Sequence, residues 1–321
     1  MLGGSVEAAI LSSAALRDTP PSVNETPETR PSPPIPSLSW TQRARDEASA
    51  VTRGRPVAAL LLVAVALVPL AIVNAIGLAQ TALWLIREGA ANGDWSNLSA
   101  VTIQDPYAAA GFRWSPPAAW LLATLIVPLG LPIWQVLHLI GVALTRDWRV
   151  IAVALLSWPF WQDLANGNVM IFVVLAAWWA LAGNRFAAVA FIALAVLIPR
   201  PLMLPVLGWL LLRQPWTRLW FVGLAVAVFG LSLVAGQLDD FAERLLVTGS
   251  SELSTIWNIG PSRLLGPAWI PIGIALAAAL AWKGWLGLAS VVISPYLFPY
   301  YALMALLDVP RLLGRPQPSH A

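Results

Sequence analysis

The sequence predicts an all-α, polytopic membrane protein, on the evidence of its composition, the length of its apolar runs and the placement of its charges. Of the 321 residues, 58% are hydrophobic and 11% are charged, and the mean hydropathy is +0.72. Soluble domains carry about 25% charged residues. Several apolar runs approach the roughly 20 residues that a helix needs to cross a bilayer. Because a backbone in lipid must satisfy its own hydrogen bonds, these runs are predicted to be helices.

The first 55 residues differ in composition from the rest. The stretch 19–39 is rich in Pro, Ser, Thr and Glu and cannot bury enough apolar surface to become ordered. Basic residues before the first apolar run predict that the N-terminus lies in the cytoplasm; they are Arg43, Arg45, Arg53 and Arg55. We therefore expect a disordered cytoplasmic tail over 1–55, a membrane domain over 56–310 and a short cytoplasmic tail over 311–321.

Prolines, glycines and charges divide the membrane domain into about ten segments, between nine and eleven. The runs taken as single crossings are 57–86, 118–145, 219–235 and 269–282, and the second is expected to bend at Gly130 because Pro132 follows. Four runs of about 12 to 14 residues are too short to cross alone. Such broken helices are tolerated where their tips line a cavity; the four are 151–162, 169–182, 187–198 and 202–212.

The last apolar run, 285–307, contains Ser294-Pro295 and Phe298-Pro299, so two half-helices are expected there. Basic residues punctuate the runs, as in membrane proteins, which argues against a nucleic-acid partner. On this map most basic residues lie at the cytoplasmic ends: Arg146, Arg149, Arg185, Arg213, Arg218, Lys283, Arg311 and Arg315.

Metal and cofactor chemistry is not indicated. The chain has no cysteine and two histidines, and the P-loop, Rossmann, Ser-His-Asp and zinc signatures are absent. Asn74 and His138 lie within apolar runs and are expected to hydrogen-bond between helices. We predict no cofactor and no metal site.

The loop 87–117, after the first run, is the densest group of acidic, aromatic and turn residues next to the membrane. Ionisable groups beside a bilayer are costly unless they have a partner or a function. Its acids include Asp94, which we take as a candidate catalytic base, and Asp105, the rival candidate. Structural alternatives are that Asp94 caps a short helix and that Asp105 opens an Asp-Pro turn.

Two helix tips, 163–168 and 199–201, are expected to be recessed on the same side of the membrane as Asp94. The first contains Asp163, Asn166 and Asn168, which suit hydrogen bonding to a sugar or phosphate but also suit a turn. The second contains Arg200 between two prolines. A guanidinium there can bind a phosphate bidentately, or it can pair with Asp163 or with the acids at 239–240.

An ordered set of elements resembles glycosyltransferase family 87, whose members are GT-C-type membrane enzymes. Trp114-Ser115-Pro116-Pro117 resembles the family's aromatic-x-Pro-Pro, and Asn166-Gly167-Asn168-Val169 resembles its Gly-Gln-Val-Asn. Arg200-Pro201 corresponds to its Lys-Pro. The stretch from Ser294 to Tyr300 is similar to its Ser-Pro and Pro-His elements, with Tyr300 in place of histidine.

The resemblance implies a GT-C-like transferase over most of 57–310. It would transfer a sugar, with mannose expected, from a polyprenyl-phosphate carrier to a lipid or glycan acceptor, with inversion. The site would lie on the extracytoplasmic side of a multi-pass cell-membrane protein in contact with membrane lipids. Asp94 stands where the family has its catalytic base, Arg200 would bind the donor, and Trp114 and Tyr300 would line the substrate site. The alternative is a transporter or flippase of lipid-linked substrates, which also uses broken helices.

Overall fold

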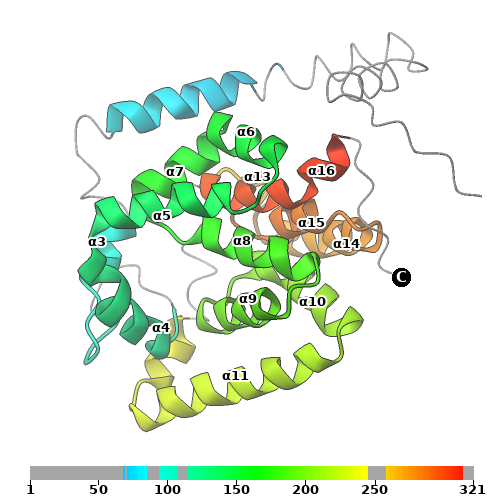
Figure 1. The fold of residues 1–321 in the computed structure, drawn as a ribbon. Coiled ribbons are helices and arrows are strands. Elements are labelled where there is room, and N and C mark those ends of the chain that lie inside the picture. Colours follow the sequence, from blue (N-terminus) through cyan, green and yellow to red (C-terminus); the bar gives the residue numbers. More distant parts are fainter. Residues whose placement is uncertain (1–67, 69–70, 85–93, 108–113, 245–257, 314–321) are drawn as a thin grey trace, which may run out of the picture. The chain divides into compact units, whose positions relative to one another are not determined.

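The computed structural model describes residues 68, 71–84, 94–107, 114–244 and 258–313, all within one compact unit that spans Arg55–Ala321. Throughout these residues the regular structure is helical and contains no strand, which confirms the all-α prediction (Figure 1). The predicted tail 1–55 lies outside the described residues, as do 314–321 at the other end.

Among the described residues, two helices are long and apolar enough to cross a membrane: Trp216–Val234 and Ser262–Trp282. Two further pairs qualify if each bent pair is one span. They are Pro116–Leu129 with Leu131–Ala143, bent by 99°, and Trp158–Asn166 with Met170–Leu181, bent by 119°. The structure therefore supports two to four membrane spans and does not confirm nine to eleven. A helix of about 13 residues is only about 20 Å long, against a hydrocarbon core of about 30 Å.

The first described helix, Ala71–Trp84, falls within the predicted run 57–86. The loop after it contains a short helix, α3 (Asp94–Ser99), which the sequence analysis considered only as an alternative. The bend predicted at Gly130 is confirmed, because Gly130 takes a left-handed φ of 79° between the 3₁₀ turn Val127–Leu129 and helix α5 (Leu131–Ala143). Before that turn come α4 (Pro116–Leu121) and a π-helical stretch, Leu122–Ile126.

The predicted single helix 151–162 is wrong. The chain forms α6 (Trp148–Leu156) and then α7 (Trp158–Asn166), with Ser157 in an extended conformation between them. Pro159 causes the break because its ring has no N–H to donate and clashes with the preceding turn of a helix. The second helix therefore starts afresh with Pro159 in its first turn.

The next three helices agree with the sequence to within about three residues. Helix α8 covers Met170–Leu181, α9 covers Arg185–Leu197, and α10 covers Leu204–Arg213 after a 3₁₀ turn at Pro201–Met203. Asn184 accepts a hydrogen bond from Ala187 N at 3.0 Å and so caps α9. These short helices end where proline, glycine or asparagine interrupts the backbone ladder, which explains why they were visible in the sequence.

The remaining chain forms α11 (Trp216–Val234), α13 (Ser262–Leu265), a 3₁₀ turn (Gly266–Ala268) and α14 (Trp269–Trp282). Then come α15 (Leu286–Ile293), a 3₁₀ helix at Pro299–Asp308 and α16 (Val309–Leu312). The predicted break of 285–307 into two half-helices is confirmed. Residues 294–298 separate the halves because Pro295 and Pro299 stop each ladder.

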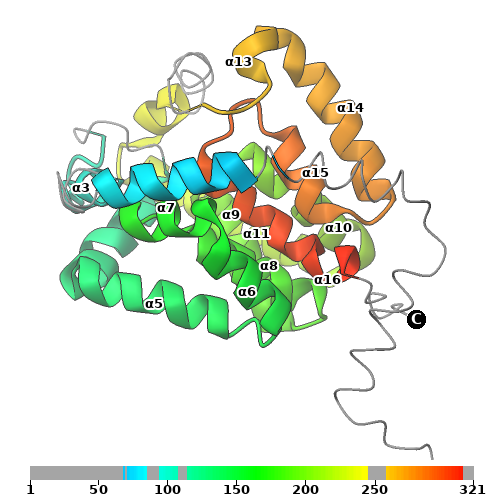
Figure 2. The ribbon, with the colours of Figure 1, turned by 90° about the horizontal axis from the view of Figure 1, so that it is seen from above.

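Helix α8 is the centre of the core and packs against α5, α7, α9 and the Pro299–Asp308 helix. In contrast, α11 runs along one edge in Figure 1 and α14 along another in Figure 2. In the most apolar 18-residue stretch of Trp216–Val234 and in that of Ser262–Trp282, which ends with α14, only 17% of the residues are buried. Exposed apolar helices of this length suit contact with lipid.

Candidate functional site

A cavity of about 60 Å³ lies where five separate parts of the chain meet. Its lining comes from α3, from Trp114 two residues before α4, from the α7–α8 turn and the first residue of α8, from the α9–α10 connection and from the start of the Pro299–Asp308 helix. The lining residues are Asn97, Leu98, Trp114, Asn168, Val169, Met170, Ile198, Arg200, Met203, Tyr300 and Tyr301. Four residues predicted from the sequence to bind substrate are therefore brought together in one place: Trp114, Asn168, Arg200 and Tyr300.

Among the described residues that line this cavity, Arg200 is the only Lys or Arg. It is half-buried and extended, with φ −125° and ψ 137°, as expected for a residue that precedes a proline. Its Nη1 donates a hydrogen bond to the Tyr296 hydroxyl at 3.1 Å. Asn97, Asn168, Tyr300 and Tyr301 also line the cavity, so polar and apolar side chains share the wall beside this guanidinium. A guanidinium in such a wall is suited to bind an anion.

The α7–α8 turn is held by hydrogen bonds to the side chain and to the backbone carbonyl of Asn168. Gly167 ends α7 in the left-handed region at φ 66°, and a Cβ there would lie 3.0 Å from Trp95 of α3. Asn168 Oδ1 accepts a hydrogen bond from Val169 N at 2.7 Å. Asn168 O accepts hydrogen bonds from Trp134 Nε1 at 3.3 Å and faces a ring nitrogen of His138 at 2.7 Å. This part of the cavity wall is therefore fixed against α5.

Asp163 lies behind the turn and does not line the cavity. It is fully buried, and its two oxygens accept hydrogen bonds from Met170 N at 3.2 Å and Ile171 N at 3.0 Å, so it caps the start of α8. Its Oδ2 also lies 3.5 Å from His138 Nε2. The prediction that His138 hydrogen-bonds between helices is confirmed, as is that for Asn74, which donates to Leu156 O at 2.9 Å. The sequence analysis missed the capping role because Asp163 lies seven residues before the helix it caps.

Two aromatic residues of the cavity are themselves packed against other rings or backbone. Trp114 is buried, and its carbonyl oxygen accepts a hydrogen bond from the Tyr107 hydroxyl at 3.0 Å. Burial, with a smaller contribution from the charge of Asp240, raises the pKa of Tyr107 above its ordinary value. Tyr300 stacks on Phe298, with ring centroids 5.7 Å apart and planes 14° apart. Both aromatic walls are thus held in place before any ligand binds.

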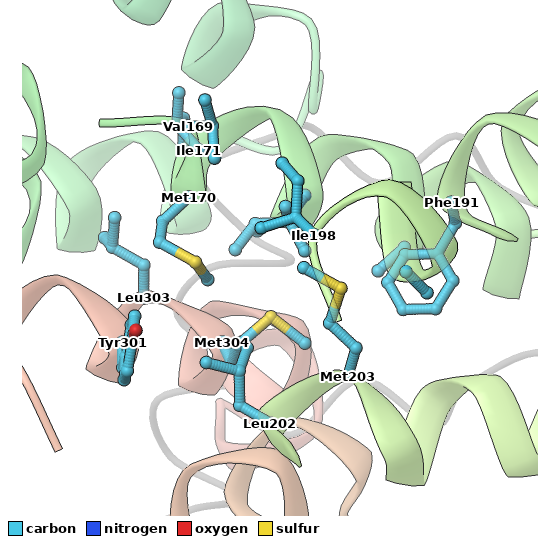
Figure 3. Close-up of a cluster of buried hydrophobic side chains, with 14 of the residues drawn as sticks. Val169, Met170, Ile171, Phe191, Ile198, Leu202, Met203, Tyr301, Leu303 and Met304 are labelled. Carbon is cyan, nitrogen blue, oxygen red and sulfur yellow. The ribbon is translucent and has the colours of Figure 1, made fainter. Parts of the chain in front are cut away.

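The cavity floor is apolar. Met170, Ile198, Met203 and Tyr301 line the cavity and also belong to the buried cluster in Figure 3. The sequence singled out none of these four. Tyr301 was the most accessible to prediction, because it follows the Pro299-Tyr300 pair already noted.

The remaining predicted residues lie elsewhere or outside the described part. Helix α3 begins at Asp94, whose side chain lies outside the described structure, while Asn97 and Leu98, one turn further on, line the cavity. Asp105 is exposed in a turn, in which its N–H donates to Thr102 Oγ1 at 3.1 Å, and does not line the cavity. Asn166 is half-buried at the end of α7 and also does not line it. Among the described residues, no group of three His, Asp or Glu side chains lies close enough to hold a metal ion.

No protein-family model, curated protein or solved structure matches the chain. The described residues therefore place the protein in a broad class, all-α proteins with helices able to span a membrane. The cavity around Arg200 is the feature on which a functional proposal rests.

Proposed function

We propose that the chain is a membrane glycosyltransferase that takes a sugar, with mannose expected, from a polyprenyl-phosphate carrier at the extracytoplasmic face. One observation carries the proposal. Trp114, Asn168, Arg200 and Tyr300 are far apart in the sequence, and they line one cavity together with α3. Asn168 and Arg200 are candidates by their chemistry, and Trp114 and Tyr300 are candidates by the family resemblance. Helix α3 is the helix that Asp94 begins.

Arg200 is the group suited to the phosphate of the donor. A guanidinium presents paired N–H groups that match phosphate oxygens, and a site of low polarity strengthens that attraction. The Tyr296 hydroxyl, 3.1 Å from Nη1, holds the guanidinium in place. In a transfer reaction the leaving group is already a phosphate, so a fixed cation that stabilises its charge is of more use than a general acid.

The volume of the cavity supports the same assignment. About 60 Å³ is roughly the space of two water molecules. A phosphate group is of this size, and a hexose ring is larger. The phosphate would therefore lie beside Arg200, and the sugar would lie at the cavity entrance between Trp114 and α3. An aromatic face such as that of Trp114 suits stacking on a sugar ring.

Asp94 would deprotonate the acceptor hydroxyl as it attacks the sugar. Asn97 lies on the cavity wall and Asp94 is three residues before it on the same helix, or roughly 5 Å along the axis. A general base contributes about 10² to 10⁴ to a rate. The position of α3 is therefore compatible with a carboxylate near the cavity mouth.

The apolar floor favours a transferase over the alternative of a transporter or flippase. A transporter needs polar groups on both sides of the substrate site. Here Met170, Met203 and Tyr301 close the cavity against the buried core (Figure 3). A closed apolar floor excludes water from a reacting sugar, which a transferase requires.

The test uses purified protein, labelled polyprenyl-phosphate-mannose and a lipid extract as the source of acceptor. Asp94→Asn is expected to lower turnover by at least about 100-fold. Asp105→Asn, the same change in the same loop, is the matched control and should leave turnover near normal. Loss of turnover in Asp105→Asn but not in Asp94→Asn would assign the base to Asp105 instead.

Arg200→Gln should raise the donor KM by about 10- to 100-fold, because a hydrogen bond to a charged group contributes about 1.5–3 kcal/mol. Arg263→Gln removes an exposed arginine of α13 and is expected to change nothing. If Arg200→Gln and Arg263→Gln change the donor KM equally, Arg200 does not bind the donor phosphate. If wild-type protein transfers no sugar but moves the labelled lipid between bilayer leaflets, the chain is a flippase.

A further inference from the structure

The helices that form the cavity carry basic residues at their opposite ends. Helix α8 starts at the cavity with Met170 and is 12 residues long, so its other end at Leu181 is about 17 Å away. Helix α9 runs back from Arg185 to the cavity. The far ends of α8 and α9 therefore define a second region of the protein, remote from the site described above.

Contacts between helix ends join this region into one face. Trp179 Nε1 donates to Leu144 O at 3.1 Å, which links the end of α8 to the end of α5. The Arg185 guanidinium lies 5.9 Å from the ring of Trp216, which links the start of α9 to the start of α11. These helix ends also lie on one side of the protein in Figure 1.

The C-terminal helices join the same face. Arg149 Nη1, at the start of α6, donates to Leu313 O at 3.5 Å. Arg311 Nη1 donates to Lys283 O at 2.6 Å and so links α16 to the turn between α14 and α15. We call the resulting surface the basic face and define it by Arg146, Arg149, Arg185, Arg213, Arg218, Lys283 and Arg311.

The acids on the basic face are occupied by backbone. Asp147 caps α6 through Arg149 N at 2.9 Å, and Asp308 is buried and accepts from Leu288 N at 2.7 Å. Within the described residues, no carboxylate oxygen lies within 4.0 Å of Arg146, Arg185 or Arg213. The described carboxylates therefore do not pair with these three arginines.

Arginines of the basic face are paired with tryptophan rings instead. The distances from guanidinium carbon to ring centroid are 5.8 Å for Arg146–Trp179, 5.8 Å for Arg149–Trp148, 5.9 Å for Arg185–Trp216, 4.7 Å for Arg213–Trp209 and 4.6 Å for Arg311–Trp285. Stacking on a ring restrains a guanidinium but leaves the N–H groups at its edge available to an anion.

Large apolar side chains project from the same face, each beside a basic residue. Phe186 is 89% exposed, Leu212 76%, Leu219 79% and Trp282 88%. Water and a soluble acidic partner solvate such side chains poorly. The headgroup region of a bilayer accepts aromatic rings, aliphatic chains and cations together.

We propose that the basic face binds the phosphates of anionic phospholipid headgroups, with its exposed apolar side chains inserted among the first carbons of the acyl chains. The occupant is the bilayer that surrounds the protein. The proposal needs only that the chain lies in a membrane, and it is independent of any transferase activity.

The test is a titration of the full chain in uncharged detergent with phosphatidylglycerol or with phosphatidylcholine of the same acyl chains, read as a shift in unfolding temperature. Phosphatidylglycerol is expected to stabilise wild-type protein at lower concentration than phosphatidylcholine. Each change among Arg146→Gln, Arg185→Gln and Arg213→Gln should raise the half-saturating phosphatidylglycerol concentration by about fivefold. The control Arg263→Gln, outside the basic face, should leave it unchanged.

Three outcomes would overturn the proposal. One is equal stabilisation of wild-type protein by the two lipids, a comparison that does not depend on any variant folding. Another is the same shift with inorganic phosphate alone, which would make the face a site for free phosphate. The third is stabilisation by a soluble acidic polypeptide such as polyglutamate but not by phosphatidylglycerol. Retention of binding when the three arginines are replaced by lysine would assign the effect to charge, as the proposal expects.

Discussion

The substitution Asp163→Asn tests whether the carboxylate behind the cavity holds the start of α8. The wild-type oxygens accept from Met170 N and Ile171 N and lie beside His138, in a fully buried environment. Asparagine has one acceptor oxygen, so its NH₂ group must face a backbone N–H that then has no partner. Loss of a hydrogen bond to a charged acceptor, with a buried N–H left unpaired, costs about 3 kcal/mol. For a chain of this size we therefore expect the unfolding temperature to fall by on the order of 10 °C.

The assay is thermal unfolding in detergent followed by tryptophan fluorescence, to which the 18 tryptophans contribute. Asp147→Asn is the matched control, because Asp147 also caps a helix but is only partly buried. Asparagine at a partly exposed N-cap accepts the same hydrogen bond about as well as aspartate, so the unfolding temperature of the control should change by no more than about 2 °C. Equal shifts in the two variants would refute the reasoning that burial makes Asp163 the stronger cap.

Two further predictions concern packing and pH. Gly287→Ala should destabilise the protein by about 1–3 kcal/mol, because the added Cβ would lie 2.4 Å from Met304 O. Gly208→Ala is the comparison in α10, where an added Cβ would have no atom within 4 Å, and it should stabilise the protein by up to about 1 kcal/mol. Thermal unfolding of the two variants distinguishes an effect of packing from one of helix propensity. The raised pKa of Tyr107, due to burial and then to Asp240, means that the folded state keeps a proton that the unfolded state releases above pH 10.0. The stability from this group is present below that pH and is lost as pH rises above it, so Tyr107→Phe should lose less stability than wild type on the same alkaline titration.

Helix ends were the most predictable part of the fold. The ends of α8, α9 and α10 follow from local chemistry: a left-handed glycine, an asparagine cap or a proline acts within one turn of where it stands. The break at Ser157 was missed although Pro159 was visible. From the sequence alone, a proline that starts a new helix cannot be told from a proline that bends a continuous one. The directions of the helices before and after it distinguish the two cases.

The candidate site was partly predictable for a different reason. Asn168 and Arg200 stand at the tips of neighbouring hairpins, so chain reversals of similar length bring them to one side of the bundle. Asp163 and Asn168 are both polar residues of the predicted helix tip 163–168, but Asp163 lies about one turn earlier, inside α7. It therefore faces the core, where it caps α8, while Asn168 lines the cavity.

The sequence alone determined that the chain is helical, apolar and interrupted at particular residues, because helix formation in an apolar run and its interruption by proline or glycine are local events. Tertiary structure decided how many helices are long enough to cross a bilayer, which polar side chains cap a helix and which line the cavity, and where the basic helix ends meet. Those outcomes depend on the direction in which each helix packs, and that direction is set by contacts between residues far apart in the chain.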